Sequence, residues 1–337
     1  MKRDAMLLVD ALRDPSSTAA LDADGWTALL AMARAEQLIG TLARRLSGLP
    51  VPTAVSEILE EARVNAEYQR RSALWEADCA RRALVDYVGK VVLMKGTAYA
   101  AAGLMASEGR HIGDLDIMVA RADLPKVEAA LLAAGWEWVK DDAYDDAYYR
   151  DHMHELPPLI HKERDRMIDV HHTILPPTAR PRPDATTMLA DAVALEDGLY
   201  VFSHADRAIH SATHLLADGE LDGGLRNLWD IHCLLTECTQ SNFWSELQSR
   251  ATHHDLWPAV QRAARMAHRL YGTDIPSGWR TKHWRDGYYI RRLTARDAWG
   301  RGTRPMLRLL FYVRSHWLRM PPLMLAGHLW VKWRKRP

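Results

Sequence analysis

The N-terminal part of the chain has hydrophobic residues at helical spacing. Apolar side chains recur every three or four positions over residues 27–46 and again over residues 54–88, which is the period of an amphipathic helix. Residues 48–52, GLPVP, separate the two stretches, because glycine and proline interrupt helices. These patterns predict a helical region over residues 1–88.

The pattern changes after Lys90. Short apolar runs, VVLMKG at 91–96 and DLDIMVA at 114–120, predict buried strands. An alanine-rich segment between them predicts a helix that ends near Gly109. A second helix is expected from Asp123, a suitable N-cap, to a terminating glycine at position 135.

Further strands are expected after these helices, with an acidic, tyrosine-rich turn after the first of them. The expected strands are residues 136–140, 153–162 and 166–175. The order of strand, helix, strand, helix and three strands indicates a small mixed α/β unit over residues 89–178.

A proline-rich connector at residues 176–184 ends this unit, and helical spacing then returns. The helices expected beyond it are residues 205–219, 225–237, 242–254, 257–272 and 306–320. The third region therefore spans residues 179–337. The fold class is α+β, a small mixed β-sheet flanked by N-terminal and C-terminal helical regions.

The 337-residue composition is that of a soluble globular protein, with a formal net charge of +1. The charge therefore predicts no nucleic-acid partner. The three cysteines have no zinc-binding spacing and indicate free thiols in a reducing compartment. Because the N-terminus lacks a signal-peptide core and no apolar run is long enough to span a bilayer, we expect a cytoplasmic protein.

The C-terminal segment, residues 298–337, contains arginines and lysines but no acidic residue. Its basic residues are Arg301, Arg304, Arg308, Arg314, Arg319, Lys332, Arg334, Lys335 and Arg336. The simpler interpretation is a docked helix with its arginines on the solvated face. The alternative is peripheral contact with an anionic membrane or an acidic partner.

Carboxylates interrupt two of the expected strands. Asp114 and Asp116 are two residues apart, so on a strand both side chains leave the same face. Asp169 sits in a similar apolar setting. Ionised carboxylates on a buried face repel one another and are costly to desolvate. Such oxygen ligands suit Mg²⁺ or Mn²⁺. The alternative is a structural role in which Asp114, after Gly113, caps a turn or forms a salt bridge.

A turn of lysine and glycine precedes the aspartates. Gly96 ends the first strand just before a helix, where backbone N–H groups can approach a phosphate. Thr97 offers a hydroxyl or a helix cap, and Lys95 and Arg110 offer positive charge. The three aspartates and this turn together are typical of chemistry on a phosphorylated substrate.

The pattern LMKG…Y…R…DLDIMV…LLAAGW…IDVHH resembles the bacterial family of uncharacterised nucleotidyltransferases, within the polymerase-β-like superfamily. The resemblance covers roughly residues 85–175 and extends more weakly into the C-terminal helices. Lys95 stands where many such transferases have glycine, and Thr97 where many have serine.

The resemblance implies transfer of a nucleoside monophosphate from an NTP to an unidentified acceptor, a peptide, saccharide or small molecule, with release of pyrophosphate. Asp114, Asp116 and Asp169 would be catalytic and would hold two divalent ions. Nucleotide-binding residues would be Lys95, Gly96, Thr97, Arg110 and His171.

Several histidines admit other interpretations. His171 shares a strand face with Asp169 and either reaches the substrate or only hydrogen-bonds a carboxylate. His152, His154 and His161 lack a regular metal-ligand spacing, so they do not by themselves predict a zinc site. The helical residues His210, His214 and Asp230 either line the opposite wall of the cleft or serve the core. Core or interhelical hydrogen bonds are the simpler explanation.

Two other functions remain open. Asp-X-Asp also binds Mn²⁺ under nucleotide sugars, which would fit a glycosyl- or phosphoryl-transferase. A non-catalytic nucleotide-binding or antitoxin-like protein is the third possibility, and the presence of all three carboxylates argues against it.

Overall fold

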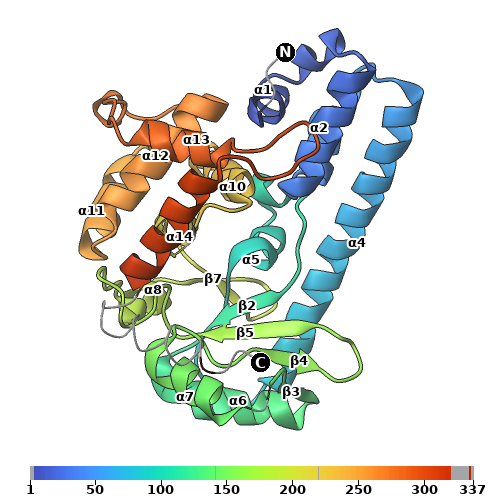
Figure 1. Ribbon diagram of the computed structural model, residues 1–337. Coiled ribbons are helices and arrows are strands. Elements are labelled where there is room, and N and C mark those ends of the chain that lie inside the picture. The colour runs from blue at the N-terminus through green and yellow to red at the C-terminus, as the bar shows by residue number, and fades with distance from the viewer. Residues whose placement is uncertain (1–3, 141, 219, 320–333, 335–337) are drawn as a thin grey trace.

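The computed structural model describes residues 4–140, 142–218, 220–319 and 334. These residues form a mixed β-sheet with helices packed around it (Figure 1), so the predicted α+β class is confirmed. Among the described helices, none combines the length and apolar character that a bilayer span requires.

The sheet has the strand order β3-β4-β5-β2-β1-β7-β6. Its strands are β1 (Val92–Leu93), β2 (Leu115–Met118), β3 (Trp136–Trp138), β4 (Leu159–His161), β5 (Met167–His171), β6 (Val193–Ala194) and β7 (Tyr200–Val201). The pairs β2–β5 and β1–β7 are parallel, and the other neighbours are antiparallel. All four residues of β2 are buried, which places this strand in the core.

Helices precede, interrupt and follow the sheet in the chain. The α-helices are α1 (Met6–Arg13), α2 (Ala23–Ala35), α3 (Ile39–Arg45), α4 (Thr53–Ala83), α5 (Lys95–Ala101), α6 (Leu124–Ala133), α7 (Ala143–His152), α8 (Ala185–Ala190), α9 (His204–Thr213), α10 (Gly224–Glu237), α11 (Phe243–His253), α12 (Trp257–Tyr271), α13 (Asp286–Leu293) and α14 (Pro305–Arg319). Shorter 3₁₀ turns span Pro15–Ala20, Met105–Ser107, Arg121–Asp123 and Ser277–Trp279, and a π turn spans His214–Asp218.

Helix α4 forms one side of the molecule, opposite α11 and α12 (Figure 1). Its buried residues, among them Val55, Leu59 and Ala80, share one face, which matches the amphipathic pattern in the sequence. On the exposed side Glu67 accepts hydrogen bonds from Arg70 and Arg71 at i+3 and i+4, a pairing that supports long helices. Contacts with α5, α6 and β2 then hold α4 beside the sheet.

Three local predictions are wrong. The acidic segment expected as a turn contains α7, where Arg150 pairs with Asp146 one turn away and with Glu128 of α6. The helix expected up to Gly109 ends at Ala101, since Gly103 follows with a left-handed φ of 64°.

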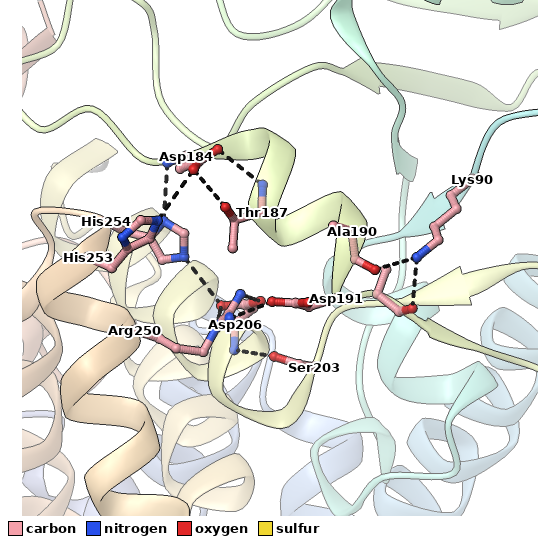
Figure 2. Close-up of polar contacts among 11 residues, drawn as sticks. Lys90, Asp184, Thr187, Ala190, Asp191, Ser203, Asp206, Arg250, His253 and His254 are labelled. Carbon is pink, nitrogen blue, oxygen red and sulfur yellow. Dashed lines mark hydrogen bonds and ion pairs between the residues drawn. The ribbon is translucent and has the colours of Figure 1, made fainter.

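The third concerns the connector, beyond which only helices were expected. Strands β6 and β7 follow it and extend the sheet beside β1. Lys90 Nζ supports this edge by donating to the carbonyl oxygens of Ala190 and Ala192, at 2.6 and 3.4 Å (Figure 2). The division into regions 1–88, 89–178 and 179–337 stays a prediction.

A buried ion pair joins α9 to α11 (Figure 2). Arg250 donates from Nε and Nη2 to the two carboxylate oxygens of Asp206, at 2.8 and 2.6 Å, and from Nη1 to Asp191 at 2.6 Å. Ser203 caps α9 by accepting from the Asp206 backbone. Burial alone would raise the pKa of Asp206, but the neighbouring His254 and Arg250 outweigh burial and lower it.

Helix α14 docks through a face that includes an arginine, contrary to the expectation that its arginines lie in solvent. Arg314 donates to the carbonyl of Leu216 at 2.8 Å and lies 5.3 Å from the ring centre of Tyr289. Phe311 is buried beside it. Arg304 and Arg308 are exposed as expected. The basic residues Lys332, Lys335 and Arg336 lie outside the described residues, so the membrane or acidic-partner alternative stays a prediction.

Candidate active site

Strands β2 and β5 bring two aspartates together. They pair in parallel with Asp116 opposite Asp169, so the two side chains leave the same face of the sheet. Asp116 is buried and Asp169 is partly buried. Asp114 lies one residue before β2 and is exposed. Asp116 and Asp169 therefore meet on neighbouring strands although they are 53 positions apart in the chain, and Asp114 lies just before the first of these strands.

Lys95 supplies the positive charge nearest to this face. Its Nζ lies 2.6 Å from Asp116 Oδ1. The residue sits where β1 turns into α5, and its φ of 49° is in the left-handed region, which a non-glycine side chain adopts at some cost. Burial would lower the pKa of Lys95, but the charge and hydrogen bond of Asp116 reverse this and raise it.

His171 is the second partner of Asp116. Its Nε2 lies 3.0 Å from Asp116 Oδ1, and its Nδ1 lies 3.3 Å from Glu155 Oε2. Burial would raise the pKa of Asp116, but the charge of Lys95 and the hydrogen bond of His171 hold it well below its usual range. Asp116 is therefore ionised at neutral pH.

The pKa of Asp169 is raised, whereas that of Asp116 is lowered. Burial, followed by the charge of Asp116, raises the pKa of Asp169 to about 7; the charge of Lys95 opposes this rise, and that of Asp114 adds a smaller increase. Burial and the charge of Asp116 also raise the pKa of Asp114. Crowded carboxylates of this kind attract a cation or hold a proton.

Arg110 contacts a different acid from the three aspartates. Its Nε donates to Asp230 Oδ2 of α10 at 3.1 Å, and its guanidinium lies 5.6 Å from the ring centre of Tyr99. Gly96 leaves room for this arrangement, because a Cβ there would overlap Arg110 Nη1. Gly96 therefore allows the buried arginine to approach the backbone of α5.

Thr97 and His210 lie in the buried surroundings of the site. The hydroxyl of Thr97 is buried and has no hydrogen-bond partner among the described residues. Such a group is costly to bury unless a ligand satisfies it. Burial lowers the pKa of His210 far below its usual value, and the positive charge of Lys95 adds to this.

Two acids near the site were not predicted to belong to it. Asp230 was placed on a possible cleft wall or in the core, and it holds Arg110. Glu155, which faces His171, was not singled out at all. Glu155 could have been identified from the sequence in the same way as Asp169, because both are acidic residues among apolar residues of an expected strand.

Comparison with known protein families gives a match over most of the chain. Residues 22–272 match the model of a family described as uncharacterised nucleotidyltransferase. The chain belongs to this family. The match extends on both sides of the predicted core, so the helical flanks are part of what the family shares. No curated protein matches the chain.

Membership in the uncharacterised nucleotidyltransferase family supports nucleotidyl transfer as the general activity and a nucleoside triphosphate as substrate. Nucleotidyltransferases usually require divalent metal ions. Asp116 and Asp169 fit hard cations, because they offer carboxylate oxygens on one face of the sheet. Asp114 adds a third carboxylate, and acidic neighbours raise the pKa of both Asp114 and Asp169. The residues present therefore suit such ions.

Proposed function

We propose that this protein transfers a nucleoside monophosphate from an NTP to an acceptor hydroxyl or phosphate, using Asp114, Asp116 and Asp169. The observation that carries the proposal is the pairing of Asp116 with Asp169 across two parallel strands. Two magnesium or manganese ions on these carboxylates would neutralise charge on the phosphates and the leaving group. Family membership supplies the reaction class.

The other residues have distinct proposed roles. Lys95 and Arg110 offset the charge of the triphosphate, with Gly96 and Thr97 contacting its outer phosphates. The unpartnered hydroxyl of Thr97 supports this role. His171 serves nucleotide binding indirectly, by orienting Asp116 through the 3.0 Å contact.

Asp169 suits the role of general base. It lies opposite Asp116 on the neighbouring strand, where it can accept the proton of an acceptor hydroxyl held beside the ions. The acceptor oxygen forms a bond to the α-phosphorus as its proton passes to Asp169. The bond from the α-phosphorus to the bridging oxygen breaks, and pyrophosphate leaves with that electron pair.

The test is pyrophosphate release from each of the four NTPs with Mg²⁺ or Mn²⁺, in the presence of cell extract as a source of acceptor. Asp114→Asn, Asp116→Asn and Asp169→Asn should each reduce release by about 100-fold or more, because each removes a charged oxygen ligand. Asp165→Asn, in the β4–β5 turn, is the matched control and should keep wild-type activity.

Nucleotide sugars form a second arm of the same assay. Consumption of a nucleotide sugar without any use of NTP would contradict the proposal and favour a sugar transferase. Equal activity in the wild type and the three aspartate variants would also contradict it.

A further inference from the structure

A second group of metal-ligating side chains lies next to the aspartates. His154, Glu155 and His171 each offer a ligand atom, and these atoms all lie within 4.8 Å of one another. Glu155 Oε2 is 3.3 Å from His171 Nδ1 and 3.8 Å from His154 Nε2. Ligands at about 2.0–2.1 Å from a tetrahedral ion are about 3.4 Å apart, so these spacings suit a single small ion.

Backbone pairing also holds part of this group in place. Glu155 forms an antiparallel bridge with His171. On either side of it, Leu156 N donates to Val170 O and His172 N donates to His154 O, both at 2.9 Å. The side chains are thus presented by paired backbone rather than by a loose loop, as a preorganised site requires.

The hydrogen bonding of His171 leaves one nitrogen in need of a partner. A neutral imidazole that donates from Nε2 to Asp116 presents a lone pair at Nδ1. This nitrogen is buried, makes no hydrogen bond of acceptable geometry among the described residues, and faces the Glu155 carboxylate. A lone pair and a carboxylate in contact repel unless a cation lies between them.

We propose that His154 Nε2, Glu155 Oε2 and His171 Nδ1 bind one transition-metal ion, Zn²⁺ or a close equivalent, at a site separate from the three aspartates. Two imidazoles and one carboxylate are ligands that zinc prefers, whereas Mg²⁺ prefers oxygen alone. The site does not depend on nucleotidyl transfer being the reaction.

The contact between His171 and Asp116 completes the site. Metal-bound histidines usually donate their other N–H group to a carboxylate, which fixes the ring orientation. His171 does this through Nε2 toward Asp116 at 3.0 Å. An ion on Nδ1 makes the Nε2–H group of His171 a stronger donor to Asp116 and fixes the orientation of that carboxylate. The proposed metal site and the aspartate site are thereby coupled.

The test is binding of the metal alone to the full chain after dialysis against a chelator. Titration with Zn²⁺ by calorimetry and with Co²⁺ by visible absorption should give one tight ion per chain. His154→Ala and Glu155→Gln should each weaken binding by about 100-fold or more. His152→Ala, a neighbouring histidine outside the group, and Asp114→Asn should leave it unchanged.

Zinc should also raise the thermal midpoint of the wild type and of both controls, but not of the two site variants. Glu155→Gln keeps the size and shape of the side chain, so it tests the site even if His154→Ala fails to fold. Unchanged binding in Glu155→Gln, or loss of the tight ion in Asp114→Asn, would overturn the proposal. NTP turnover plays no part in these measurements, so their failure is distinguishable from failure of the proposed function.

Discussion

Asp169 has two acidic neighbours and one basic neighbour, and Lys95 is engaged by Asp116. Its raised pKa therefore reflects burial and the charge of Asp116, which Lys95 offsets only in part. A carboxyl group whose pKa rises on folding binds a proton more tightly in the folded state. The protein is then destabilised wherever that proton is lost.

The pH dependence of stability follows from this shift. Asp169 has a pKa of about 7 in the folded state and about 3.9 when unfolded. Its favourable contribution is complete below about pH 4 and is lost as pH rises to 7. In EDTA, the free energy of unfolding of the wild type should fall relative to that of Asp169→Asn by up to about 4 kcal/mol between pH 4 and pH 8.

Urea denaturation of both proteins across this pH range provides the measurement. Asp165→Asn, which lies in an exposed turn, serves as the control and should follow the wild type at every pH. A constant difference between the wild type and Asp169→Asn would show that the pKa of Asp169 is not raised on folding.

Sequence reasoning was most informative for single residues in strands. Alternation within short apolar runs indicates strands around Asp116 and Asp169, and both residues lie on strands. Glu155 could not be placed in the same way, because its approach to His171 depends on one backbone bridge between segments that the sequence does not show to be paired. Local patterns do not reveal such long-range contacts.

At the scale of elements, long amphipathic helices such as α4 could be predicted because their stability is encoded in one apolar face. Helix α7 could not, since its residues are mainly polar and ion pairs with α6 support it. Strands β6 and β7 have two residues each. They are too short for alternation to show and exist through pairing, β7 with β1 and β6 with β7.

The junction of α9 and α11 depends on one buried ion pair. Asp206 is fully buried and Arg250 nearly so, with 0% and 18% of the side chains exposed. Arg250→Ala should lower the free energy of unfolding by about 3–5 kcal/mol, because it leaves a buried carboxylate without its main counterion. Chemical denaturation monitored by circular dichroism measures this loss.

Arg280 offers a matched control on the surface. It pairs with Asp274, whose side chain is 96% exposed, so Arg280→Ala should cost less than about 1 kcal/mol. Adding Asp206→Asn to Arg250→Ala should recover part of the loss by removing the unpaired charge. If Arg250→Ala costs no more than Arg280→Ala, the pair does not stabilise the junction.

At the scale of the whole molecule, a buried polar network joins the three predicted regions. Asp230 of α10 accepts from Arg226 at 2.6 Å and from Arg110 at 3.1 Å. Arg226 also donates to Thr41 of α3 at 2.9 Å. The helices before and after the sheet are thereby tied to the segment that leads into β2.

Asp230→Asn should destabilise the entire chain rather than one helix. It leaves two buried guanidinium groups without a counter-charge, so the free energy of unfolding should fall by about 3–5 kcal/mol. Asp222→Asn is the control, because Asp222 also contacts two arginines but its side chain is half exposed, and it should cost less than about 1 kcal/mol.

Urea unfolding followed by tryptophan fluorescence and by circular dichroism measures both variants. The two signals should shift together for Asp230→Asn. Separate transitions, or a loss no larger than that of Asp222→Asn, would contradict a network that unites the molecule.

The in-register pairing of Asp116 with Asp169 also determines which insertions and deletions the chain can tolerate. Neighbouring strands are about 4.8 Å apart, and paired catalytic metal ions about 3.5–4 Å. The backbone hydrogen bonds between β2 and β5 therefore set the spacing of the two aspartates, whatever the length of the chain between the strands. Insertions or deletions in the surface turns between β2 and β5, such as the turn after β4, therefore leave the distance between Asp116 and Asp169 unchanged.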